Sequence, residues 1–204
     1  MRLTNNLARR PLLLSALTTS LLTQPLALRA ATPPPYTLSV PDSFVTLAPR
    51  DSSTLYVAGN FATGTTLSVQ RLTASSVLAS ASPCGDGASA LSCTAGVAAL
   101  AVQLAAVRDR QAAPSGSSSK VMPESIRADG GKLSFEMLLT LVGDNASDAM
   151  RADPELSRRT AVAVLVDGDD ELLCLWAGAK VINWDRGDGE LLRRAVASFA
   201  LAPK

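Results

Sequence analysis

Two groups of closely spaced carboxylates are the side chains of this sequence best suited to chemistry, because such groups can chelate a cation. Histidine is absent from all 204 residues, which excludes Ser-His-Asp and Cys-His nucleophilic catalysis, histidine bases and histidine-ligated metals. An enzyme built on carboxylates alone would need a deep pocket holding two or more acids. The two groups are Asp167, Asp169, Asp170 and Glu171, and Asp185, Asp188 and Glu190.

Both acidic groups have simpler structural explanations. Asp167-Gly168 between two apolar runs is typical of a hairpin turn, and the spacing of the acids does not match an EF-hand loop. Asp188 is expected to cap a closing helix, and Glu190 lies in the first turn, where the helix dipole favours negative charge. We therefore predict no catalytic residue, no metal site and no bound cofactor, and we expect the protein not to be an enzyme.

Trp184 follows the last apolar run and has two interpretations. It covers the end of a sheet as a buried side chain, or it anchors a partner protein, since Trp and Arg dominate interface hot spots. In the second case Arg158, Arg159 and Arg186 supply positive charge to an acidic partner surface; in the first they are ordinary solvated arginines. These four residues form the candidate partner-binding site.

The composition indicates one folded domain preceded by a targeting segment. Hydrophobic residues make up 47% and charged residues 18%, which is enough to form a core and argues against global disorder. Four arginines and no acidic residue precede Ala31, so the rest of the chain is mildly acidic although the formal net charge is +1. Nucleic-acid binding, which needs a basic surface, is not predicted.

Residues 1–30 are typical of an export signal. Arg9 and Arg10 precede the apolar run Pro11–Leu17, and small residues follow up to Ala30. This order predicts a cleaved targeting segment, and the paired arginines fit the twin-arginine route. A short membrane anchor is the alternative, but polar residues interrupt the run well below the roughly 18 residues that a spanning helix needs.

The three cysteines are too few for a disulfide-built scaffold. Cys84 and Cys93 lie in a Gly/Ser-rich segment and either close a small disulfide in an oxidising compartment or remain two separate thiols. Cys174 lies within an apolar run and is expected to be a small buried residue.

The hydrophobic pattern predicts an α+β domain with helices on both faces of an antiparallel sheet. In Lys132–Leu141, apolar and polar residues alternate as in a strand with one buried face. Ala161–Val166 is apolar on both faces, and Leu192, Ala195, Val196 and Phe199 form the apolar stripe of the closing helix. Further strands are expected at Tyr36–Val40, Thr54–Ala58, Thr65–Leu72 and Leu172–Ala179, a helix at Ala95–Gln111 capped by Thr94, a loop or short helical turn at 42–49, a flexible loop near 112–120, and a polar loop at 143–159.

Four segments, in this order, resemble the PsbP family of thylakoid-lumen proteins. They are YTLSVPDSF, similar to the family's opening strand; TTLSVQRL, similar to its next core strand; IRADGGKLSFEMLLTL, similar to a hairpin leading into a long strand; and RRTAVAVLVDGDDELLCLWAGAKVINWD followed by SFAL, similar to its closing hairpin, Trp and helix.

The resemblance implies an α/β/α sandwich over residues 31–204, without a catalytic centre, in the chloroplast thylakoid lumen. It implies a protein at the thylakoid membrane periphery that binds lumenal photosystem subunits, chiefly of photosystem II, and aids assembly or stability. The alternative role is an extrinsic subunit of the oxygen-evolving complex that favours calcium and chloride retention, a link to these ions that is only indirect. The short arm Ala31–Pro35 and the low lysine content favour an auxiliary factor; the lysines are Lys120, Lys132, Lys180 and Lys204.

Overall fold

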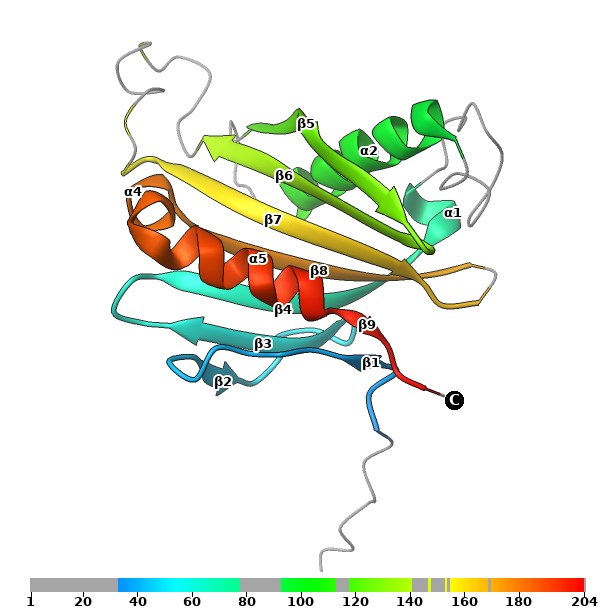
Figure 1. Ribbon diagram of the computed structural model, residues 1–204, viewed down its shortest axis with the longest axis horizontal. Coiled ribbons are helices and arrows are strands. Elements are labelled where there is room, and N and C mark those ends of the chain that lie inside the picture. Colours follow the sequence, from blue (N-terminus) through cyan, green and yellow to red (C-terminus); the bar gives the residue numbers. More distant parts are fainter. Residues whose placement is uncertain are drawn as a thin grey trace, which may run out of the picture. The chain divides into compact units, whose positions relative to one another are not determined.

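The computed structural model describes residues 33–77, 93–112, 118–140, 147, 153, 155–168 and 170–203 (Figure 1). The chain divides into two compact units, Met1–Pro33 and Pro34–Lys204, and the fold described below is that of the second unit. The predicted targeting segment 1–30 and Cys84 lie outside the described residues. Both interpretations of Cys84 and Cys93, a small disulfide and two separate thiols, therefore stay predictions.

A seven-stranded antiparallel sheet forms the centre of the unit, in the order β2-β3-β4-β8-β7-β6-β5. A small separate pair joins the two ends of the unit, because β1 pairs with β9. The strands are β1 (Tyr36–Thr37), β2 (Val45–Leu47), β3 (Thr54–Asn60), β4 (Thr65–Thr73), β5 (Ser118–Asp129), β6 (Lys132–Thr140), β7 (Ser157–Val166), β8 (Glu171–Lys180) and β9 (Ala200–Leu201).

Helices cover both faces of the sheet, as the hydrophobic pattern predicted (Figure 1). On β8, Leu172, Cys174 and Trp176 belong to the core beneath α2, whereas Leu173 and Leu175 belong to the core beneath α5. Alternate side chains of one strand thus fill two cores, which explains the doubly apolar sequence. The helices are α1 (Ala74–Val77), α2 (Thr94–Ala112), α4 (Val181–Asn183) and α5 (Gly189–Ser198), with a turn of π-helix, η2 (Trp184–Asp188), between the last two.

The predicted fold class, an α/β/α sandwich around an antiparallel sheet, is confirmed. The alternation predicted for β6 is also confirmed, because Leu133, Phe135 and Met137 are buried beneath α2. Gly130 and Gly131 form the two-residue turn into β6 with φ values of 55° and 82°. Such a turn requires positive φ at both central positions, which glycine adopts without strain.

Several predicted boundaries are wrong. The strand expected at Tyr36–Val40 is only the two-residue β1, and β2 occupies part of the segment expected to be a loop or helical turn. β2 is an edge strand with exposed or half-exposed side chains, so its sequence has no strong hydrophobic pattern. β5 begins at Ser118, inside the predicted loop 112–120, and α1 was not predicted.

The polar loop expected up to Arg159 ends earlier, because β7 begins at Ser157. Arg158 and Arg159 pair in register with Leu139 and Leu138 of β6, so they belong to the sheet. No helix in the described part of the chain is long and apolar enough to cross a membrane.

Candidate functional site

Trp184 lies beyond the end of β8, where the chain passes through α4 into η2. Its side chain is buried, with an exposed fraction of 4%. Gly189, the first residue of α5, packs against the indole so closely that a Cβ at this position would lie 2.7 Å from Nε1 and from Cε2. Gly187 has a φ of 124°, which bends the chain between Trp184 and α5. The two glycines together hold the indole against the sheet.

Two arginines cover the indole of Trp184. The guanidinium carbon of Arg159, from β7, lies 5.3 Å from the ring centroid, and that of Arg193, from α5, lies 5.1 Å away. Both distances fall within the roughly 6 Å over which a cation is attracted to an aromatic ring. A molecule approaching this surface therefore meets guanidinium groups before it meets the indole.

Glu136 of β6 holds both arginines in place. Its Oε2 accepts a hydrogen bond of 2.7 Å from Arg159 Nε and lies 2.6 Å from Nη2, while its Oε1 accepts one of 2.7 Å from Arg193 Nε. Burial by itself raises the pKa of Glu136, but the hydrogen bonds and charges of Arg193 and Arg159 outweigh it and hold this pKa below its usual value. One carboxylate thus joins β6, β7 and α5 and leaves a local excess of positive charge.

Lys132 lies four residues before Glu136 on the same face of β6. Its side chain binds the C-terminal end of α5. Its Nζ donates hydrogen bonds to the carbonyl oxygens of Val196, Ala197 and Phe199, at 2.6, 3.0 and 2.8 Å. The last carbonyls of a helix lack partners within the helix and carry partial negative charge, so a lysine ammonium satisfies them well. Desolvation lowers the pKa of Lys132.

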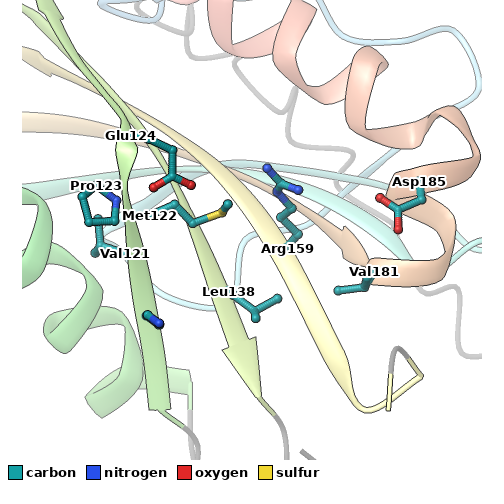
Figure 2. A pocket seen from close by; sticks show the side chains of 9 residues that line it. Val121, Met122, Pro123, Glu124, Leu138, Arg159, Val181 and Asp185 are labelled. Carbon is teal, nitrogen blue, oxygen red and sulfur yellow. The ribbon is translucent and has the colours of Figure 1, made fainter. Parts of the chain in front are cut away.

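A cleft of about 340 Å³ lies beside Arg159, between β5 and η2 (Figure 2). Arg159 lies between two carboxylates, with Glu124 from β5 on one side and Asp185 from η2 on the other (Figure 2). Within the described part of the chain, neither carboxylate forms an ion pair. The other residues that line the cleft are Lys120, Val121, Met122, Pro123, Leu138 and Val181.

The structure brings Trp184 and Arg159 together, but it separates them from Arg158. Neighbouring residues of a strand point to opposite faces, so Arg158 lies on the α2 face, where its Nη2 donates to the carbonyl oxygens of Gly64 and Gly178, each at 3.1 Å. Arg186 is exposed on η2, and no ion pair of it occurs among the described residues. The burial of Trp184 agrees with its interpretation as a cover over the sheet end.

Sequence analysis did not identify Glu136 and Arg193 as parts of this site. Glu136 does carry a signal, because it lies on the polar side of a strongly alternating strand. Which partner it meets depends on the face that α5 covers and on the register of β6 with β7, and neither follows from local pattern. Its partners Arg159 and Arg193 lie 23 and 57 residues after Glu136 in the chain.

One carboxylate of each acidic group accepts hydrogen bonds within the fold. Asp170 accepts hydrogen bonds from the backbone N and the Oγ of Ser75, at 2.8 and 3.0 Å, at the start of α1. The prediction that Asp188 caps α5 is wrong. Asp188 has helical angles and makes no side-chain cap hydrogen bond, and its carboxylate accepts from Thr65 Oγ1 instead. No three His, Cys, Asp or Glu side chains among the described residues are placed to hold a metal ion.

Comparison with solved structures finds proteins of similar fold. The solution structure of cyanobacterial PsbP (CyanoP) from Synechocystis sp. PCC 6803 matches with a TM-score of 0.52 and 15% sequence identity, over 82% of this chain and 87% of that one. The chain has a PsbP-like fold. At this identity the likeness concerns the fold alone.

Two further structures match less well than CyanoP. A mutant of Mog1 has a TM-score of 0.48 and 14% identity, over 82% of this chain and 90% of its own. LpqN of Mycobacterium tuberculosis, involved in cell envelope biogenesis, has a TM-score of 0.42 and 13% identity, over 82% and 83%. No protein-family model matches the sequence, and no curated protein sequence matches it.

Proposed function

We propose that this chain is a non-catalytic PsbP-domain protein of the chloroplast thylakoid lumen. It binds lumenal photosystem subunits, chiefly of photosystem II, at the membrane periphery and aids assembly or stability of the complex. The observation that carries this proposal is the similarity of the fold to cyanobacterial PsbP over 82% of the chain. The twin-arginine pattern in residues 1–30 and the absence of histidine support it independently.

Binding would use the surface around the cleft beside Arg159. Arg193 of α5 and Arg186 of η2 are exposed, and Arg159, which shares Glu136 with Arg193, is partly buried. Glu136 holds Arg159 and Arg193 in fixed positions, so little side-chain freedom is lost when a partner binds. An acidic lumenal surface would complement the guanidinium groups of Arg193 and Arg186, while the carboxylates of Glu124 and Asp185 in the cleft would meet basic groups of the partner. Electrostatic complementarity contributes chiefly to specificity and to the rate of association.

Native-gel migration of the tagged full-length protein, from solubilised thylakoids shaved with protease, tests the proposal. Protection from protease and comigration with photosystem II assembly intermediates are expected. Comigration with mature photosystem II in stoichiometric copies would instead indicate a resident extrinsic subunit. Digestion by the protease would contradict the lumenal location, and migration at monomer size would contradict stable binding.

Charge reversal tests the binding face separately. Arg186→Glu is expected to weaken comigration without destabilising the fold, because Arg186 is exposed on η2. Arg110→Glu is the matched control, since Arg110 is an exposed arginine near the end of α2, the helix that covers the opposite face of the sheet. Equal comigration of the two variants would place the docking face elsewhere.

A further inference from the structure

A second and larger hollow, a groove of about 910 Å³, lies on the α2 face of the sheet. β3 and β4 form one side of the groove, and Arg108 and Gln111 of α2 lie on the other. The groove exists because the side chains of β4 on this face are small or polar: Thr66 and Ser68 line it, and Gly178 of β8 lies beside Thr66 in register. The opposite face of β4 is instead filled by the core beneath α5.

Arg108 lines this groove, and Arg158, which does not line it, reaches toward the lining residue Thr66. The guanidinium carbon of Arg108 lies 5.5 Å from the ring centroid of Trp176. Arg158 Nη2 lies 3.4 Å from Thr66 Oγ1. Arg50 and Asp51 also line the groove, and the carboxylate of Asp51 accepts hydrogen bonds from Ser53 and Thr54.

Across the described residues, neither the guanidinium of Arg108 nor that of Arg158 forms an ion pair. Arg158 Nη2 already donates to two backbone carbonyls, whereas Arg108 forms no hydrogen bond or ion pair with any described residue. Partly buried charges are normally paired, so an anion beside Arg108 is the group that this site lacks.

The electrostatics of Arg108 and Arg158 support an anion-binding site in the groove. Burial lowers the pKa of Arg108, and the positive charge of Arg158 lowers it further, while the carboxylate of Asp109 acts in the other direction. Burial likewise lowers the pKa of Arg158. Asp109 is engaged elsewhere, because it accepts hydrogen bonds from the backbone N and the Oγ of Ser119 at 2.8 and 2.6 Å. An anion bound beside Arg108 would offset the repulsion between the two arginines.

Gln70 provides an independent sign that a ligand belongs here. Its side chain lines the groove and is 7% exposed, yet Oε1 accepts no hydrogen bond from any described residue. Trp176, beside Ser68 in register, is 3% exposed and has an Nε1 donor without a partner among the same residues. Buried polar atoms without partners are rare and each costs roughly 1–3 kcal/mol. Both atoms are enclosed and Trp176 does not line the groove, so a ligand reaches Gln70 Oε1 only when the Gln70 amide turns into the groove. Such a ligand carries a hydrogen-bond donor as well as a negative charge.

We propose that the groove binds an extended acidic peptide segment of a partner protein. A carboxylate of the segment pairs with Arg108, and a backbone N–H donates to Gln70 Oε1. The size of the groove favours a peptide over a small inorganic anion, because 910 Å³ is near the upper end of ordinary ligand pockets. Val57 in the lining and Phe61, which is 73% exposed, offer apolar contacts to neighbouring side chains of the segment.

The proposal goes beyond the photosystem role, since it concerns the opposite face of the sheet and holds for any partner with such a segment. Fluorescence anisotropy of the purified full-length protein tests it without photosystem components. The probe is a fluorescein-labelled peptide, Ala-Glu-Val-Glu-Val-Glu-Ala, with blocked ends, and the matched control peptide has Gln in place of each Glu. We expect the acidic peptide to bind at least about tenfold more tightly than the control.

Variants locate the binding site. Arg108→Gln is expected to weaken acidic-peptide binding at least about tenfold, because one partner of a partly buried charge pair is lost. Arg110→Gln, an exposed arginine two residues along the same helix, should change binding less than about twofold. Gln70→Leu keeps a similar side-chain volume and should weaken binding of both peptides several-fold, because a hydrogen-bond acceptor is lost. If Arg108→Gln does not fold, this variant tests the binding site in its place.

Three results would overturn the proposal. The first is equal binding of the acidic and Gln peptides, and the second is unchanged binding in Arg108→Gln and Gln70→Leu. The third is failure of the acidic peptide to bind while sodium sulfate raises the unfolding temperature of the wild type but not of Arg108→Gln, which would identify a small-anion site instead. None of these results depends on thylakoid comigration, so this proposal and the photosystem role fail separately.

Discussion

Gly189 lies directly against the indole of Trp184, and no other residue fits at this position without moving the ring. A Cβ at position 189 would be 2.7 Å from Nε1 and 2.8 Å from Cδ1. The ring cannot move away freely, because Arg159 and Arg193 lie over it and its side chain is buried. The start of α5 is therefore positioned by contact with an aromatic side chain, with no side-chain cap.

The first prediction concerns this contact. Gly189→Ala should lower the free energy of unfolding by about 1–3 kcal/mol, the usual cost of overpacking a core. Alanine is the better helix former by about 1 kcal/mol, so propensity alone predicts the opposite sign. Urea denaturation followed by far-UV circular dichroism measures the change. A variant as stable as the wild type would show that the indole can shift at little cost.

The second prediction concerns the carboxylate that joins β6, β7 and α5. Glu136→Gln should lower the free energy of unfolding by about 1–3 kcal/mol, because it leaves Arg159 and Arg193 without their shared partner. The side chain of Glu136 is 14% exposed, whereas that of Glu190, which pairs with Arg194, is 60% exposed. Glu190→Gln is therefore the matched control, with an expected cost below about 0.5 kcal/mol. Equal costs for the two variants would contradict a structural role of Glu136.

The third prediction is the pH dependence of the same carboxylate. The pKa of Glu136 in the folded protein lies below its ordinary value of 4.5, which we assign to the unfolded chain. Its stabilising contribution is therefore fully present above about pH 4.5 and is lost as the pH falls through the lower folded pKa. The difference in unfolding free energy between wild type and Glu136→Gln should shrink over that range. Denaturation curves of both proteins between about pH 7 and pH 3 measure it, and a constant difference would contradict it.

The fourth prediction concerns Cys174 in the central strand β8. Its side chain is fully buried, and burial raises the pKa of the thiol well above its usual value. Alkylation needs both a thiolate and access to it. Iodoacetamide should label Cys174 at least about a thousandfold more slowly in the native protein than in denaturant, since labelling requires nearly global unfolding. Mass spectrometry of the peptide containing Cys174 gives the rate, and rapid native labelling would indicate local opening of the sheet.

Most of the fold follows from periodicity in the sequence. Lys132–Thr140 alternates with period two, and Leu192, Ala195 and Val196 recur with helical spacing, so each element carries its own local signal. The apolar run at 161–166 could only be buried on both faces, which required a covering layer on each side. The edge strand β2 escaped prediction because it is short and largely exposed, and β1 is shorter than predicted because it pairs with the distant β9 over only two residues.

The sequence by itself therefore determined the layers of this protein, since burial of apolar faces is a local property of strands and helices. Only the tertiary structure decided how the charged residues meet. Arg158 and Arg159 are neighbours in the chain, yet strand alternation sends one to the α2 groove and the other to Trp184 and Glu136. The contacts of Glu136 with Arg193, and of Asp188 with Thr65, join segments far apart in sequence. Such pairings depend on strand register and helix placement, which are global consequences of packing.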